Sequence, residues 1–236
     1  MNNFYVSRKN EVRPNRLVNF LNESFRLLKK GYYIQALPNA MIDMTTVEQR
    51  INYFHLLDGV LSNAVEGDLI ELGCFTGQCA LLFQEILEAK GSDKRLHLYD
   101  SFEKKFTVDE AIEGVLIRNF KQKGLKLPVI HKGFFEDTLP EQLPEHISFA
   151  HIDCGFGGDV LEHKKIMLYC LNAIYPRLSR NAVCVLMDYH NRSEDNFALD
   201  ANPGVKLACD EFLSSKSEKV FSLYGNQYAH GFFRKE

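Results

Sequence analysis

Residues 67–82 read GDLIELGCFTGQCALL, and this stretch decides the fold. A short apolar strand ends in Glu71, a loop with the glycines Gly73 and Gly77 follows, and an apolar helix begins directly after that loop. The order strand, glycine loop, helix is typical of the nucleotide-holding turn of a doubly wound α/β fold. A similar turn in another kind of α/β protein is the competing interpretation, because such folds carry many functions.

The spacing of this loop favours a ligand that has no phosphate group. It is Glu-x-Gly-x-x-x-Gly rather than Gly-x-Gly-x-x-Gly, and the tighter motif is the one that brings a pyrophosphate onto a helix N-terminus. S-adenosylmethionine has no phosphate, so its site needs only glycines that let the backbone approach the ligand. We expect Glu71 to attract or orient the ammonium end of such a ligand.

A second acidic residue ends the next expected strand. Residues 95–99 form a β-type run that is followed by Asp100 and Ser101. In dinucleotide-binding folds an acid in this place accepts hydrogen bonds from the hydroxyls of a ribose. The alternative is that Asp100 caps the following helix, since Asp and Ser are favoured N-caps. The order of the two acidic residues favours ligand binding.

Composition indicates an enzyme-like domain with one core. The chain has 236 residues, of which 45% are hydrophobic and 25% charged, and its net charge is −3. That charge argues against a nucleic-acid partner. No apolar run is long enough to span a bilayer, and the first residues lack the apolar core of a signal peptide. We therefore expect a cytoplasmic protein without membrane or nucleic-acid partners.

The six cysteines are expected to be reduced and buried. None of them forms a Cys-x-x-Cys pair, and without a secretion signal they behave as small hydrophobes. Cys74 and Cys79 flank the glycine loop at a spacing that does not suit a closed zinc site.

The pattern along the chain predicts a mostly parallel sheet with helices on both faces. Candidate strands cover residues 68–72, 95–99, 128–131, 147–152, 182–187, 219–223 and 227–233, and candidate helices lie near 78–90, 108–123, 160–175 and 202–215. Alternation of strands and helices argues for parallel pairing. The last two strands are close enough in sequence to form a hairpin, which adds an antiparallel strand. We expect residues 1–64, with helices over 16–30 and 46–63, to form a helical cap or lid, and residues 65–236 to form the ligand-binding domain.

Two further acids end neighbouring central strands. Asp153 and Asp188 are expected to face each other across a cleft, because ligands of open α/β sheets bind outside the carboxyl ends of the strands. Such a pair suits a hard divalent cation with oxygen ligands, or one acid acts as a general base for a hydroxyl. Helix capping or loop hydrogen bonding is the alternative role for either residue.

In several segments the chain resembles the macrocin O-methyltransferase family. The members of this family are S-adenosylmethionine-dependent enzymes that methylate sugar hydroxyls in antibiotic and related glycoside pathways. The matching segments run in family order from about residue 44 to the end of the chain. They are GDLIELGCFTG (67–77), YDSFE (99–103), GFFEDTLP (133–140), HID (151–153), YPRLS (175–179), DY (188–189) and PGVKLACDEF (203–212). The GFFEDTLP and YPRLS segments are the most specific together.

The resemblance implies a Rossmann-like methyltransferase sheet and assigns roles to individual residues. It implies that residues of the first three strand ends hold S-adenosylmethionine, namely Glu71, Gly73 and Gly77 along the loop, Asp100 and Ser101 at the ribose, and Gly133 and Phe134 near the adenine. It also implies that Asp153 lies beside the transferred methyl group, as a metal ligand or as the base.

The chain departs from the family pattern at two acidic positions. The family's Asp-x-Asp reads Asp153-Cys-Gly155 here, and its Asp-Asp-Tyr reads Met187-Asp-Tyr189. Loss of carboxylates weakens a Mg²⁺ site, which relies on oxygen ligands. The candidate metal ligands are therefore Asp153 and Asp188, with Asp159 or His190 as a replacement, and the need for Mg²⁺ stays open.

The expected reaction is an in-line methyl transfer to a hydroxyl of a small molecule, a sugar or a glycosylated natural product. Asp153 is the first candidate for the base and His190 the second, because its pKa lies near neutrality; a surface histidine is the alternative reading of His190. Tyr189 and His190 are expected to shape the acceptor cleft, and a segment with Tyr32, Tyr33 and Met44 to close over the ligand.

Two other functions compete with this one. A degenerate family member would bind S-adenosylmethionine or a glycoside without turnover, which the two missing carboxylates motivate. An unrelated α/β oxidoreductase would bind a nicotinamide nucleotide, against which the absence of Gly-x-Gly-x-x-Gly argues. Association into a homo-oligomer through the N-terminal helices also stays open.

Overall fold

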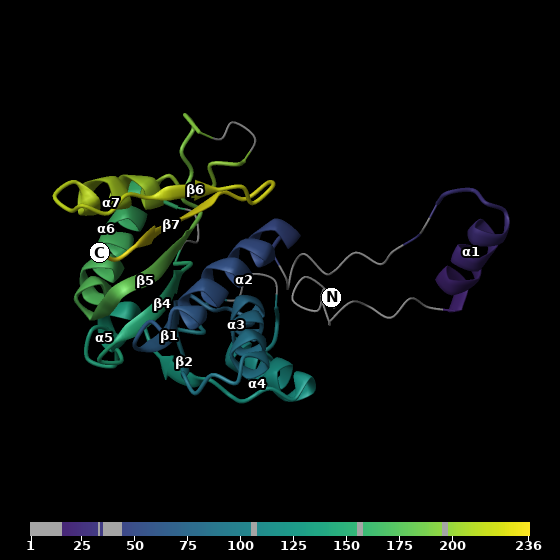
Figure 1. Ribbon diagram of the computed structural model, residues 1–236, viewed down its shortest axis with the longest axis horizontal. Coiled ribbons are helices and arrows are strands. Elements are labelled where there is room, and N and C mark those ends of the chain that lie inside the picture. Colours follow the sequence, from purple (N-terminus) through teal and green to yellow (C-terminus); the bar gives the residue numbers. More distant parts are fainter. Residues whose placement is uncertain (1–15, 33, 35–43, 105–107, 155–157, 195–197) are drawn as a thin grey trace.

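The computed structural model describes residues 16–32, 34, 44–104, 108–154, 158–194 and 198–236. Its centre is a seven-stranded sheet (Figure 1). The strands are β1 (Asp68–Leu72), β2 (Leu96–Asp100), β3 (Val129–Lys132), β4 (Ile147–Ile152), β5 (Leu178–Met187), β6 (Phe221–Leu223) and β7 (His230–Arg234). Their order across the sheet is β3-β2-β1-β4-β5-β7-β6.

The sheet topology confirms the expected fold class. Strands β1 to β5 pair in parallel, whereas β7 is antiparallel to both β5 and β6. The strand order reverses between β1 and β4, and such a switch point is where open α/β sheets bind their ligands. Strand β5 begins four residues earlier than the expected 182, because Leu178 already pairs with Ile147 of β4.

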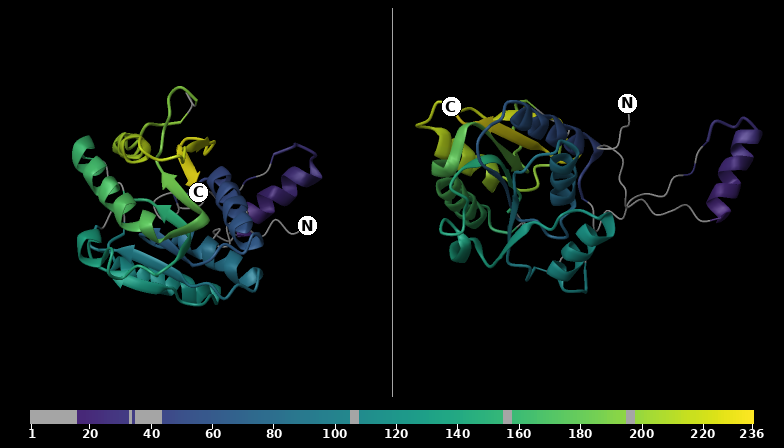
Figure 2. Two further views of the ribbon diagram at one scale, coloured as in Figure 1. Left: turned by 60° about the vertical axis from the view of Figure 1, so that its left-hand side comes forward. Right: turned by 60° about the horizontal axis from the view of Figure 1, so that its bottom comes forward.

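Helices cover both faces of the sheet (Figures 1 and 2). One face carries α2 (Val47–Ser62), α3 (Gln78–Ala89) and α4 (Ile112–Lys123), and the other carries α5 (Phe135–Thr138), α6 (Val160–Ile174) and α7 (Gly204–Leu213). A short 3₁₀ turn, η1 (Tyr175–Arg177), leads from α6 into β5. Burial of the apolar faces of these helices on the sheet is the main favourable term in folding.

Helix α2 belongs to the layer over the sheet. Its residues Tyr53, Leu57 and Val60 are fully buried in the core. The helix begins with a capping box in which Thr46 and Gln49 each satisfy a backbone N–H of the other. The Thr46 hydroxyl also donates a hydrogen bond to the Gly225 carbonyl, 2.9 Å away, which ties the start of α2 to the turn between β6 and β7.

Helix α1 (Arg16–Leu27) lies apart from the sheet in Figures 1 and 2, and none of its residues is buried. Tyr32 and Met44 are exposed, while Tyr33 lies outside the described residues. The division into a cap of residues 1–64 and a domain of residues 65–236 stays a prediction, as does the closing segment.

All six cysteines are free thiols, and five of them are buried while Cys79 is partly exposed. Within the described ranges, no helix combines the length and the apolar character that crossing a membrane requires.

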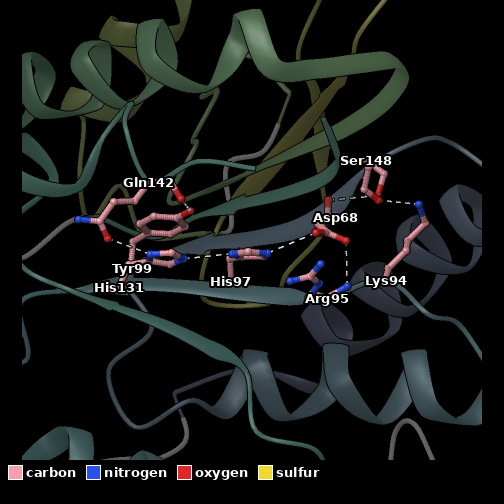
Figure 3. Close-up of polar contacts among 9 residues, drawn as sticks. Asp68, Lys94, Arg95, His97, Tyr99, His131, Gln142 and Ser148 are labelled. Atoms are coloured by element: carbon pink, nitrogen blue, oxygen red, sulfur yellow. Dashed lines mark hydrogen bonds and ion pairs between the residues drawn. The ribbon is translucent and has the colours of Figure 1, made fainter. Parts of the chain in front are cut away.

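A row of polar side chains crosses β1, β2 and β3 on the face that carries α5 (Figure 3). The two imidazoles of His97 and His131 lie stacked, with Nδ1 of His97 3.0 Å from Nε2 of His131. Asp68 and Gln142 take the remaining ring nitrogens, at 3.3 and 2.9 Å respectively. Burial lowers the pKa of His97 despite Asp68, so the fold favours the neutral imidazole.

His230 at the start of β7 is a second histidine that the fold holds neutral. Its side chain is fully buried, with the ring edge-on to Tyr53 and with Nε2 3.0 Å from Nδ2 of Asn52. Burial, followed by the nearby His151, lowers the pKa of His230 to about 4. A charge on this ring would have to be removed from water without a compensating anion.

We predict that the free energy of unfolding falls on acidification, and that His230→Phe weakens this dependence. The folded pKa of His230 is about 4, whereas an unfolded histidine titrates near pH 6.5. Below about pH 6.5 the unfolded chain therefore binds more protons, and stability is lost as the pH falls towards 4. The loss carried by this one residue should be on the order of 3 kcal/mol at pH 4. Urea unfolding of both proteins between pH 7 and 4 measures it, and parallel curves would contradict the prediction.

Candidate active site

Acidic residues from four strands gather at the carboxyl edge of the sheet. Glu71, Asp100, Asp153 and Asp188 lie within one residue of the ends of β1, β2, β4 and β5, as the strand pattern predicted. Burial raises the pKa of Asp153 well above its usual value, and the neighbouring Asp188 and Glu71 raise it further. The fold thus concentrates negative charge at its switch point, where a cationic ligand would be attracted.

Two cavities open at this edge and share Gly73. The larger has a volume of about 340 Å³, and five of the predicted cofactor residues line it, namely Gly73, Asp100, Ser101, Gly133 and Phe134. The smaller has a volume of about 60 Å³ and is lined by Glu71, Asp153, Met44 and Met187, among others. Glu71 and Asp153 line the smaller cavity, whereas Gly77 lines neither, so the role of each residue in cofactor binding stays a prediction.

The glycines of the loop satisfy two steric demands. Gly73 has a φ of +80°, and a Cβ atom there would lie 1.9 Å from the carbonyl oxygen of Asp153. Gly77 precedes the first residue of α3 with a φ of +81°, and a Cβ there would press on the side chain of Leu116 at 3.0 Å. Gly73 thus lets β1 approach β4, and Gly77 lets the loop turn into α3.

Asp100 holds the glycine loop in place. One carboxylate oxygen accepts hydrogen bonds from the backbone N–H groups of Cys74 and Phe75, both at 3.0 Å, and the other accepts from the N–H of Phe102 at 2.7 Å. The N-cap of α4 is Ala111, so Asp100 does not cap that helix. A carboxylate offers about four acceptor positions, which leaves room for a ribose hydroxyl beside these three contacts.

Glu71 forms a buried contact with His151 of β4. The two residues are paired in the sheet register, and Nδ1 of His151 lies 2.9 Å from Oε1 of Glu71. Burial raises the pKa of Glu71, whereas the hydrogen bond from His151 lowers it. The Cys79 sulfur completes a set whose ligand-type atoms lie within 4.8 Å of one another. Glu71 and His151, two members of this set, are already joined by a hydrogen bond. This favours a polar contact between side chains over a metal site.

The predicted metal ligands have other partners. Asp188 accepts a hydrogen bond of 2.6 Å from the Asn202 side chain, and Asp159 caps α6 by accepting from the backbone N–H groups of Leu161 and Glu162. Asp159 also lines the larger cavity, whereas Asp153 lines the smaller one.

At Met187, where the resemblance leads one to expect an acid, the thioether sulfur lies 3.3 Å from both Nε2 of Gln49 and the hydroxyl of Tyr53. A thioether sulfur in place of a carboxylate fits Mg²⁺ poorly, because the ion requires hard oxygen ligands. The metal assignment stays a prediction.

His190 is buried rather than exposed in a surface loop. Its Nδ1 lies 3.8 Å from a carboxylate oxygen of Asp200, which also meets Arg192 at 3.3 Å. Tyr189 is buried as well. Neither residue is among those that line the two cavities. Their roles in the acceptor cleft, and that of His190 as a base, therefore stay predictions.

Two features of the site escaped the sequence patterns. One is His151, whose contact with Glu71 depends on strand register. The other is Cys154, whose pKa is lowered to about 6 by hydrogen bonds from Cys170 and His163. His163 and Cys170 lie seven residues apart on α6, and this spacing on one helix face was the available signal.

Comparison with known proteins identifies relatives of the chain. Residues 3–202 match the family model described as Macrocin-O-methyltransferase (TylF). The 8-demethyl-8-(2,3-dimethoxy-alpha-L-rhamnosyl)-tetracenomycin-C 4'-O-methyltransferase of Streptomyces olivaceus is 26% identical over 174 residues, which are 64% of either protein. The mycinamicin III 3''-O-methyltransferase of Micromonospora griseorubida is 26% identical over 179 residues, 64% of this chain and 66% of that one. The chain therefore spans slightly less than two thirds of the length of these relatives.

Solved structures share the fold. The O-methyltransferase NovP superposes with a TM-score of 0.67 at 20% identity, over 85% of this chain and 84% of that one. The calicheamicin methyltransferase CalS11 superposes with a TM-score of 0.59 at 15% identity, over 97% and 96%. The expected Rossmann-like methyltransferase fold is thus confirmed.

We predict that Gly73→Ala destabilises the protein far more than Gly91→Ala. Both glycines have positive φ values, but only at Gly73 would a Cβ meet a neighbouring carbonyl oxygen, whereas nothing lies within 4 Å at Gly91. Gly91→Ala should cost about 1–2 kcal/mol of conformational strain. Gly73→Ala should cost several kcal/mol, because β1 and β4 must separate. Denaturant unfolding of both variants measures the difference, and equal costs would contradict the close approach.

Proposed function

The chain belongs to the macrocin O-methyltransferase family, and from that premise we propose that it is an S-adenosylmethionine-dependent O-methyltransferase. The acceptor is a hydroxyl group of a sugar, carried by a glycosylated natural product. Two relatives support this substrate class, since their names describe a rhamnosyl-tetracenomycin 4'-O-methyltransferase and a mycinamicin III 3''-O-methyltransferase. Two solved neighbours of this fold, at 13% and 14% sequence identity, are described as bound to S-adenosylhomocysteine.

The observation that carries the proposal is the pair of cavities that meet at Gly73. The nucleoside of the cofactor occupies the larger cavity, with its ribose at Asp100 and Ser101 and its adenine beside Phe134. Phe134 is 48% exposed, so a stacked base would cover apolar surface that now faces solvent. The methionine end lies in the smaller cavity, where acidic side chains balance its positive charge.

The reaction follows from this placement. The acceptor oxygen attacks the methyl carbon in line with the sulfonium, the carbon–sulfur bond breaks, and S-adenosylhomocysteine leaves. Holding both reactants in this geometry is the main contribution of the protein. Asp153 receives the hydroxyl proton in its ionised form, and the burial and neighbouring acids that raise its pKa make that carboxylate a stronger base than an ordinary one.

The other functions considered from the sequence gain no support. No finding favours a non-catalytic binding module or a nicotinamide-dependent oxidoreductase, and the relatives are described as methyltransferases. A cytoplasmic location, association into a homo-oligomer and a need for Mg²⁺ stay predictions.

We predict that Asp153→Asn lowers kcat about 100-fold or more while the affinity for S-adenosylhomocysteine changes by less than about threefold. The variant keeps the shape of the side chain but loses the proton acceptor. Methyl transfer from S-adenosylmethionine to a sugar-bearing acceptor provides the rate, and Asp210→Asn on the exposed face of α7 is the matched control. Activity that survives EDTA but not this substitution supports a base, whereas an unchanged kcat would contradict the role.

We predict that Asp100→Asn weakens the binding of S-adenosylhomocysteine about tenfold or more. The substitution turns one of the two acceptor oxygens that hold Cys74, Phe75 and Phe102 into an N–H donor, so part of the loop's anchor and the negative charge that faces the ribose are lost. Calorimetric titration measures the effect, again with Asp210→Asn as the control. Affinity equal to that of the unsubstituted protein would show that Asp100 has no part in the site.

A further inference from the structure

The contact between Glu71 and His151 lies at the smaller cavity. Glu71 is 2% exposed and His151 is fully buried, and the two side chains come from adjacent parallel strands. Nδ1 of His151 is 2.9 Å from Oε1 of Glu71. Both residues precede the strand ends at which the methyl transfer is proposed, so neither needs to touch the acceptor.

Two aromatic rings fix the imidazole. Tyr53 of α2 and Phe83 of α3 approach it edge-on, with ring centroids 5.0 and 5.5 Å away. The other nitrogen of the ring, Nε2, has no hydrogen-bond partner among the described residues. The ring therefore has one polar contact that determines its orientation, and that contact is Glu71.

Glu71 has one oxygen left for a ligand. Oε1 is taken by His151, whereas Oε2 is buried without a hydrogen-bond partner in the described part of the chain. Glu71 lines the smaller cavity. A buried carboxylate oxygen without a partner is costly, so a cationic group in this cavity would be bound favourably.

We propose that His151 is a positioning residue for the cofactor, because its Nδ1–H holds Glu71 in the one orientation that directs Oε2 to the α-ammonium group of S-adenosylmethionine. The inference rests on the proposed function and extends it to a residue to which the sequence analysis gave no role. It concerns the amino-acid end of the cofactor alone. Under the proposed function, the nucleoside end belongs to the residues that line the larger cavity.

The test compares two ligands that differ in the amino-acid end. S-adenosylhomocysteine carries the α-ammonium group, whereas 5′-methylthioadenosine lacks the whole amino-acid part. Calorimetric titration of both ligands into the unsubstituted protein and into His151→Phe gives a ratio of affinities that a merely structural role would not change. We expect His151→Phe to weaken S-adenosylhomocysteine about 10- to 100-fold, as for the loss of a hydrogen bond to a charged group, and to leave 5′-methylthioadenosine within about threefold.

Two further variants make the test specific. His151→Asn keeps an N–H donor near the place of Nδ1 and should retain most of the affinity for S-adenosylhomocysteine, which also covers the case that His151→Phe fails to fold. His230→Phe is the matched control, because His230 is equally buried and also edge-on to Tyr53, at 5.5 Å. It should leave the ratio of the two affinities unchanged.

Two results would overturn the inference. One is an unchanged ratio of the two affinities in a folded His151→Phe protein, whether both affinities stay or both fall equally; if that variant does not fold, an equal fall of both affinities in His151→Asn has the same meaning. The other is an affinity for S-adenosylhomocysteine that falls on addition of EDTA, since the oxygen of Glu71 would then serve a metal ion together with Cys79. An unsubstituted protein that binds neither ligand would instead refute the proposed function, and this inference with it.

Discussion

The close approach of β1 to β4 at Gly73 is the constraint on which the rest of the site depends. The backbone of this residue passes so near the Asp153 carbonyl that no side chain fits between them. Backbone hydrogen bonds join this point to the neighbouring strands. The N–H of Gly73 donates to the carbonyl of Tyr99 on β2 at 2.9 Å, and the N–H of Asp153 donates to the carbonyl of Leu72 on β1 at 2.8 Å. The two cavities meet at this point, so the path of the backbone determines where a ligand can lie.

The meeting of the parallel strand ends at one edge of the sheet also explains the negative charge at the site. Parallel strands end at one edge, so acids that follow them are forced together and into partial burial. Burial and the mutual repulsion of Asp153, Asp188 and Glu71 raise the pKa of Asp153. A cofactor with a sulfonium and an ammonium group relieves this repulsion, which links the electrostatics of the fold to the class of ligand that it binds.

Much of this arrangement could be predicted from local patterns. The strand–loop–helix order around Gly73 and Gly77, the acids at the strand ends and the hairpin close to the end of the chain all follow from periodicity and spacing within short windows. The boundaries were less predictable, as β5 shows, because its first pair depends on where β4 begins. The surroundings of His190 were not predictable, because the residue it lies beside, Asp200, is ten positions away in the chain.

The sequence by itself determined the class of the fold, the position of the loop and the acids Glu71, Asp100 and Asp153, because each depends on neighbours in the chain. Only the tertiary structure decided what those acids contact. Asp100 anchors a loop 25 residues earlier, and Glu71 meets a histidine 80 residues later. Met187 of β5 receives hydrogen bonds from Gln49 and Tyr53 of α2, more than 130 residues earlier in the chain. Such contacts are set by strand order and register, and these emerge only when the whole sheet has formed.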